Sequence, residues 1–217
     1  MRHILISAAI AAVLAGCSSG EKTARFLIDP PAPTERLPNR LGTTELKEVS
    51  LPDYASGDEV SWQSADGAVR SNTKQLWADN PERAFTLTLA RSISDLSGAT
   101  VIAEPWPLAE PARRTLEVRV EKALAQADGR YRLTGRYYIA DAGAGGANQA
   151  RGFDIAVPLG GEATPAAVAR AQSLAIAQLA RQIAVLGGPG NAIRTSAPAT
   201  PRFDDIFSQP LPPLEGS

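Results

Sequence analysis

Hydrophobic and polar residues alternate most regularly in the second half of the chain, and this alternation predicts three long β-strands. Every second residue of 116–121 is apolar, and the residues between them are charged. An Asp-Gly pair at 128–129, typical of a hairpin turn, precedes the apolar positions of 131–139. A glycine-rich stretch at 143–146 then separates this strand from a third one at 153–157. We expect an antiparallel meander with one face against the core and the other in solvent.

Two other segments repeat their apolar residues at the spacing of an α-helix. The first begins after Asn80, a residue type favoured at the N-cap, with proline at the first helical position, and it ends at Gly98. The second begins after Thr164 in the same way and is expected to end at Gly187. Alanine fills many of its remaining positions, which allows close packing on a sheet. Packing on the protein's own sheet is favoured over a contact with a partner helix.

Shorter apolar runs predict further strands at 25–29, 45–51, 60–63, 69–72 and 101–103. An Asp-Gly pair joins the third and fourth of these as a hairpin. The order strand, helix, strand within one sheet implies a right-handed crossover and parallel pairing. The pattern therefore predicts an α/β fold in a single domain, with a mixed β-sheet that contains an antiparallel meander, two main helices, and flexible segments at both ends.

The composition changes at both ends of the predicted domain. Residues 4–14 form an apolar run behind a basic residue, too short to span a bilayer and typical of a signal peptide. Six prolines fall between residues 188 and 217, so we expect a disordered tail there. The predicted organisation is a signal peptide at 1–16, a tether at 17–24, a domain at 25–187 and a Pro-rich tail at 188–217.

Cys17, the only cysteine, ends the sequence Leu-Ala-Gly-Cys directly after the apolar run. This sequence resembles the lipobox of bacterial lipoproteins. In those proteins the cysteine sulfur receives a diacylglyceryl group, the chain is cut before the cysteine, and the new amine is acylated. Two or more acyl chains hold a protein stably on a membrane, whereas one does not. The next residue is Ser18 rather than the aspartate of inner-membrane retention, which favours the outer membrane with the body facing the periplasm.

A chain cleaved before Cys17 lacks the groups on which many catalytic and metal sites depend. Met1 and His3 are the only methionine and histidine, and both would be removed. This excludes Ser-His-Asp and Cys-His nucleophiles, and zinc or copper sites built on imidazole or sulfur. Carboxylates for glycoside hydrolysis or calcium binding remain open. The balance of 22 basic and 23 acidic residues does not suggest a nucleic-acid partner, and we expect no cofactor.

Three short motifs follow one another around the predicted strands and the first helix. They are Leu-Pro-Asp-Tyr at 51–54, Leu-Trp-Ala-Asp at 76–79 and Pro-Trp at 105–106. With the lipobox, they resemble the ABC-type transport auxiliary lipoproteins, the family of paraquat-inducible protein C. The resemblance implies an outer-membrane lipoprotein with one α/β domain that works beside an intermembrane lipid transport system. The other parts of such a system are an MCE-domain protein and, often, an ABC transporter in the inner membrane.

The aromatic residues of these motifs, Tyr54, Trp77 and Trp106, are the candidates for partner binding. Rigid aromatic side chains often carry binding energy, but tryptophan also packs in cores, and core packing is the alternative for each ring. The main hypothesis is a non-catalytic accessory protein that docks the outer-membrane end of an MCE-type system, with a homo-oligomer left open. The alternative is a general envelope-binding or scaffolding lipoprotein without a transport role; an enzyme ranks third.

Overall fold

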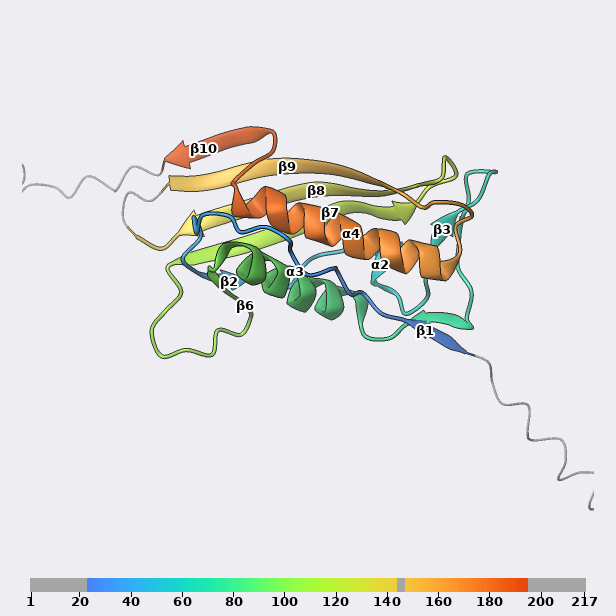
Figure 1. The fold of residues 1–217 in the computed structure, drawn as a ribbon, viewed down its shortest axis with the longest axis horizontal. Helices are drawn as coiled ribbons and strands as arrows, with labels where there is room; N and C mark the ends of the chain where they lie inside the picture. Colours follow the sequence, from blue (N-terminus) through green and yellow to red (C-terminus); the bar gives the residue numbers. More distant parts are fainter. Residues whose placement is uncertain (1–22, 144–146, 195–217) are drawn as a thin grey trace, which may run out of the picture.

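The computed structural model describes residues 23–143 and 147–194, and its centre is a mixed eight-stranded β-sheet (Figure 1). Two long helices contact each other and cover one face of this sheet. The hydrophobic core lies between the helices and the sheet. The predicted single α/β domain with two main helices is confirmed.

The meander has the arrangement that the alternating pattern predicts. It consists of three strands of 12 residues each, β7 (Arg114–Ala125), β8 (Arg130–Asp141) and β9 (Ala147–Pro158), paired antiparallel. The apolar positions face the helices and are buried, whereas most residues between them are exposed or half-buried on the opposite face. On that open face Arg132 on β8 forms an ion pair with Asp154 on β9 at 2.9 Å.

The predicted strand–helix–strand unit is also present. Strand β2 (Thr43–Leu46) pairs in parallel with β6 (Thr100–Ala103), and helix α3 (Pro81–Ser97) lies between them in the sequence. The side chain of Asn80 accepts a hydrogen bond from the backbone N–H of Arg83 at 2.9 Å, as its N-cap position predicts. The helix ends at Gly98, whose φ of 68° lies in the left-handed region that glycine adopts without strain.

Strand β2 is shorter than the strand predicted over residues 45–51. It ends at Leu46, and the chain then continues beside β7 with only an isolated bridge between Ser50 and Arg119. Val49 is fully buried although it lies outside the strand, so the apolar pattern reports burial here rather than regular pairing.

Helix α4 (Pro165–Ala184) crosses the meander and packs against β8 and β9. Thr164 caps it by accepting a hydrogen bond from the backbone N–H of Ala167 at 3.3 Å. The helix ends before the predicted Gly187, because the chain turns at Leu186, whose φ is 57°. Most of its alanines are buried, which confirms that this face packs on the protein's own sheet. No helix among the described residues is long and apolar enough to cross a membrane.

Two small strand pairs lie at the end of the sheet where α4 begins. Strand β1 (Ala24–Phe26) pairs in parallel with β5 (Gln75–Trp77), a strand that the sequence pattern did not predict. The predicted hairpin is present as β3 (Trp62–Gln63) and β4 (Val69–Arg70), and β3 joins the end of β7. The single-turn helix α2 (Asp53–Ser56) precedes this hairpin.

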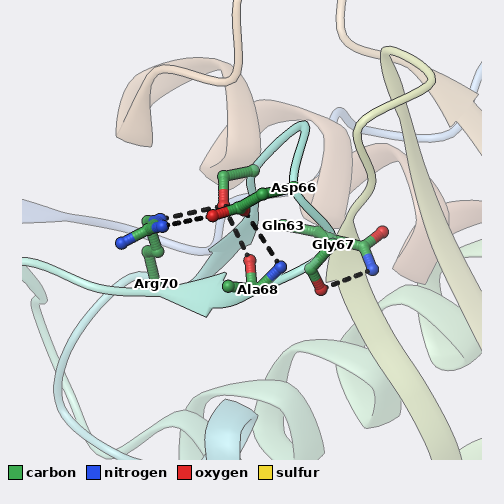
Figure 2. Close-up of polar contacts among 6 residues, drawn as sticks. Gln63, Asp66, Gly67, Ala68 and Arg70 are labelled. Atoms are coloured by element: carbon green, nitrogen blue, oxygen red, sulfur yellow. Dashed lines mark hydrogen bonds and ion pairs between the residues drawn. The ribbon is translucent and has the colours of Figure 1, made fainter.

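Asp66 organises the turn between β3 and β4 (Figure 2). Its carboxylate accepts hydrogen bonds from the Ser64 hydroxyl and the Ala68 N–H, and it pairs with Arg70 at 2.5 Å. These contacts, with that of Ser64 the largest, lower the pKa of Asp66 to about 2. The Gln63 side chain donates to the Gly67 carbonyl at 3.1 Å and closes the turn.

The last described strand, β10 (Gly190–Arg194), corrects the predicted end of the domain at residue 187. It pairs antiparallel with β9 and forms one edge of the sheet, whose order is β10-β9-β8-β7-β2-β6. The rest of the predicted tail, residues 195–217, lies outside the described residues, as does the predicted signal peptide. The described chain enters at β1 and leaves at β10, at opposite ends of the molecule (Figure 1).

Candidate functional site

Trp77, one of the three aromatic candidates, belongs to the core. It is the last residue of β5 and is 5% exposed. Its backbone N–H donates to the Asp58 carbonyl at 2.8 Å, and its own carbonyl accepts from the Arg25 guanidinium at 3.3 Å. The alternative of core packing therefore describes Trp77, and its ring is not available to a partner in this structure.

Tyr54 lies on α2 and fills a gap beside β7. Its hydroxyl accepts a hydrogen bond from the backbone N–H of Ala123 at 3.2 Å. On β7, Ala123 lies between Arg119, which bridges to Ser50, and Ala125, which pairs with β3. Its carbonyl accepts from the Ser61 hydroxyl at 2.9 Å. The half-buried ring borders a polar hollow of about 540 Å³, so Tyr54 combines a structural hydrogen bond with accessible aromatic surface.

Trp106 lies in the loop at 104–113 that joins β6 to β7. Its indole N–H donates to the Glu110 carbonyl at 2.7 Å, and its backbone N–H donates to the Glu45 carboxylate at 3.2 Å. The ring is half-buried, and Leu108 at the same loop is 50% exposed. Trp106 is thus held in one orientation while part of its ring and the neighbouring leucine remain accessible.

A cluster of charged residues fixes the start of this loop. Lys47 forms ion pairs with Glu45 at 2.9 Å and with Glu104 at 3.0 Å. The Glu104 carboxylate also accepts from the Glu48 N–H at 2.7 Å. This backbone hydrogen bond, followed by that of Lys47, lowers the pKa of Glu104, and the hydrogen bond to Glu45 is the largest cause that raises the pKa of Lys47. These contacts anchor the loop to β2.

Tyr54 and Trp106 do not form one surface. Tyr54 contacts Ala123 near the last residues of β7, whereas the loop at 104–113 leads into Arg114, the first residue of β7. Because a strand rises by about 3.3 Å per residue, the 12 residues of β7 span roughly 40 Å. The two remaining candidates therefore lie at opposite ends of the sheet.

An apolar groove on the helical face was missed by the sequence analysis. The chain that follows β1 runs across the contact between α3 and α4 (Figure 1), and hollows of about 690 and 150 Å³ lie beside it. Leu27 borders both hollows and is 71% exposed, while Leu87 and Leu174 on the two helices are 46% and 37% exposed. Both helical leucines fall outside the apolar stripes of their helices, which is the sequence signal that could have indicated this groove.

Among residues 23–143 and 147–194 no group of three or more His, Cys, Asp or Glu side chains is placed to hold a metal ion. The Asp58-Glu59 pair lies at the polar hollow beside Tyr54, where the Glu59 carboxylate accepts from the Ser71 hydroxyl. Cys17, the predicted lipidation site, lies outside the described residues.

Comparison with known proteins gives a consistent result. Residues 26–184 match the family model described as the ABC-type transport auxiliary lipoprotein component. The chain is 30% identical over 132 residues to the intermembrane transport lipoprotein PqiC of Escherichia coli K12, a match that covers 58% of this chain and 68% of that protein. The protein of the same name from Shigella flexneri matches with the same figures.

Solved structures share the fold. A crystal structure of an uncharacterized protein superposes with a TM-score of 0.58 at 22% identity, over 70% of this chain and 95% of the other. Protein XCC0632 from Xanthomonas campestris superposes with a TM-score of 0.56 at 15% identity, over 74% of this chain and 92% of the other. At these identities the likeness concerns the fold alone.

Proposed function

Because the chain belongs to the family of ABC-type transport auxiliary lipoprotein components, we propose that it is the lipid-anchored outer-membrane component of an intermembrane lipid transport system. The placement of the anchor rests on the Leu-Ala-Gly-Cys sequence that ends at Cys17 and on Ser18 after it. In this proposal the protein faces the periplasm and docks an MCE-domain protein of the inner-membrane system without performing chemistry itself.

The observation that supports a docking role is the separation of the two ends of the domain. The chain that leads from Cys17 enters at β1, whereas the loop at 104–113 lies at the far end of β7. A partner that reaches across the periplasm meets the end that points away from the anchor. We therefore assign the docking contact to Trp106 with Leu108, and keep Tyr54, at the other end, as the second candidate.

The test is recovery of the partner with single variants. Trp106→Ala should weaken binding to a tagged MCE-domain protein about tenfold or more, because an aromatic hot spot contributes about 2 kcal/mol or more at an interface and about 1.4 kcal/mol is already tenfold. Its melting temperature should change little, since the ring is half-buried and outside the core cluster. Tyr54→Ala is the matched variant at the opposite end, and a selective loss of binding there would move the docking contact to α2.

The transport role has its own decisive outcome. Deletion of the protein should increase the permeability of the outer membrane, and crosslinked envelopes should yield an MCE-domain protein together with this chain. Normal permeability and no MCE-domain protein in the crosslinked fraction would contradict the transport role. They would leave the general envelope-binding lipoprotein as the function.

A further inference from the structure

The apolar groove beside β1 carries exposed leucines that the core does not use. Leu27 follows β1 directly and borders the hollows on both of its sides, next to α4 and next to α3. Leu87 lies at the smaller hollow and Leu174 at the larger. Exposed apolar side chains that cluster in this way mark contact surfaces more often than isolated ones do.

Two arginines that form no ion pair within the described residues border the larger hollow. Arg25 and Arg170 are exposed, and each donates one hydrogen bond to a backbone carbonyl, that of Trp77 or of Leu159, at 3.3 Å. Neither forms an ion pair with any residue that the structure describes. The carboxylate of the same hollow, Asp29, pairs with Arg91 at 3.1 Å. The surface thus combines exposed leucines with two arginines whose charges are not paired with a carboxylate of the described residues.

The position of this surface along the chain is as informative as its chemistry. Six residues lie between Cys17 and Ala24, the first residue of β1, so seven Cα–Cα steps join the two positions. A fully extended chain of this length spans at most about 25 Å. An anchor at Cys17 therefore holds β1 within about 25 Å of the membrane surface. This reach is shorter than β7, which spans roughly 40 Å.

We propose that the β1 surface, defined by Arg25, Leu27, Leu87, Arg170 and Leu174, lies against the membrane that holds Cys17. The leucines enter the boundary between headgroups and acyl chains, and the arginines contact lipid phosphates, as basic amphipathic surfaces do. This rests on the proposed lipid anchor. It adds a fixed orientation to that anchor, in which β1 lies on the membrane and the loop at 104–113 is held away from it.

The test uses the single cysteine of the chain. In the lipidated full-length protein the Cys17 sulfur is blocked, so a cysteine introduced elsewhere takes a fluorescent label alone. Leu27→Cys and Leu108→Cys are matched variants, because both replace an exposed leucine, at opposite ends of the domain. Each labelled protein is inserted into vesicles of phosphatidylethanolamine and phosphatidylglycerol that contain a nitroxide lipid. The label at 27 should be quenched severalfold more strongly than the label at 108.

Equal quenching at both positions, or stronger quenching at 108, would overturn the orientation. A label at 27 that is shielded from a water-soluble quencher but not reached by the nitroxide lipid would also overturn it, and would point to a second protein chain on this surface. Mass spectrometry separates these outcomes from a failure of the proposed function. An acylated Cys17 with an unquenched label at 27 refutes the membrane contact alone, whereas a Cys17 without acyl groups refutes both.

The contribution of the arginines is tested in the same vesicles. Replacing Arg25 and Arg170 together by glutamine should reduce the quenching of the label at 27, because the contacts with lipid phosphates are lost. Arg136→Gln is the control, since this exposed arginine lies on β8, on the face of the sheet opposite the helices. Unchanged quenching in the double variant would overturn the assignment of these cations to phosphates.

Discussion

At the scale of single residues, Gly135 is the position at which β8 tolerates no side chain. It lies opposite Val120, beside the register shift in β7. A Cβ atom there would clash with the Arg119 carbonyl oxygen and lie 2.7 Å from Cζ of Phe153. Gly135→Ala should lower the free energy of unfolding by roughly 1–3 kcal/mol, because the neighbouring backbone must move. Urea denaturation measures this. Gly57→Ala, with no atom near its Cβ position and a φ of −72°, should change little, and equal effects would contradict the argument.

Tyr137 ties the meander to the chain that follows α4. Its hydroxyl donates to the Gly187 carbonyl at 2.5 Å, and burial raises its pKa from 10.0 to about 12. Tyr137→Phe should lower the free energy of unfolding by about 1 kcal/mol at neutral pH, since a hydrogen bond is lost and the Gly187 carbonyl loses its donor.

The same residue predicts an alkaline limb of stability. Between pH 10 and 12 the unfolded tyrosine ionises while the folded one keeps its proton, so this stabilisation is complete below pH 10 and is lost as the pH rises towards 12. The loss should be smaller in Tyr137→Phe, although Tyr131, whose pKa burial also raises, retains part of it. Identical pH profiles of the two proteins, measured by urea denaturation, would contradict this assignment.

At the scale of elements, β10 is predicted to stabilise the edge of the sheet. The Pro189 carbonyl accepts from the Gly152 N–H at 2.6 Å, and the Arg151 guanidinium donates to the Gly190 carbonyl at 2.5 Å. A chain that ends at Gly187 loses these bonds and should be less stable by roughly 1–3 kcal/mol. A chain that ends at Arg194 keeps them and should match the full-length protein. Hydrogen exchange of the β9 amides and urea denaturation distinguish the two truncations, and equal behaviour would refute this role of β10.

The elements that the sequence predicts best are those whose signals are local. Asn80 and Thr164 are capping side chains next to prolines, and both helices begin where these residues place them. The meander follows from alternation because its strands are long and have one wet face. Strand β5 has only three residues, which is too short to show an alternating pattern in the sequence. It is a strand because β1 pairs with it. Strand β10 follows Gly188 and Pro189, a composition typical of a linker, and only its pairing with β9 makes it a strand.

The candidate site was predictable only in part, and for a similar reason. Trp77 and Trp106 occupy similar motif contexts, yet one is in the core and the other is half-buried in a loop. The burial of each ring depends on which elements pack over it, and this tertiary packing cannot be predicted from a single sequence. The groove beside β1 is formed by three segments that are distant in sequence, and the sequence analysis missed it. Leu87 and Leu174, which fall outside the apolar stripes of their helices, are the only signal that could have indicated it.

At the scale of the whole molecule, the lipid anchor is the first prediction to test. Cys17→Ala should leave an uncleaved or soluble precursor and no form that fractionates with the outer membrane, because the acceptor of the acyl groups is gone. Labelling with a radioactive fatty acid measures this directly. Incorporation into the Cys17→Ala protein at the level of the wild type would contradict the assignment, and Ser18→Ala, which keeps the cysteine, is the matched control.

The exit of the two chain ends at opposite ends of the sheet has a mechanical consequence. If the membrane holds one end and a large assembly moves at the other, tension runs along the strands rather than across them. Strand β1 lies parallel to β5 and β10 antiparallel to β9, so a pull on either terminus slides a strand along its neighbour. Several backbone hydrogen bonds are then loaded at the same time instead of opening one after another. The domain can therefore carry tension between the membrane and a bound assembly.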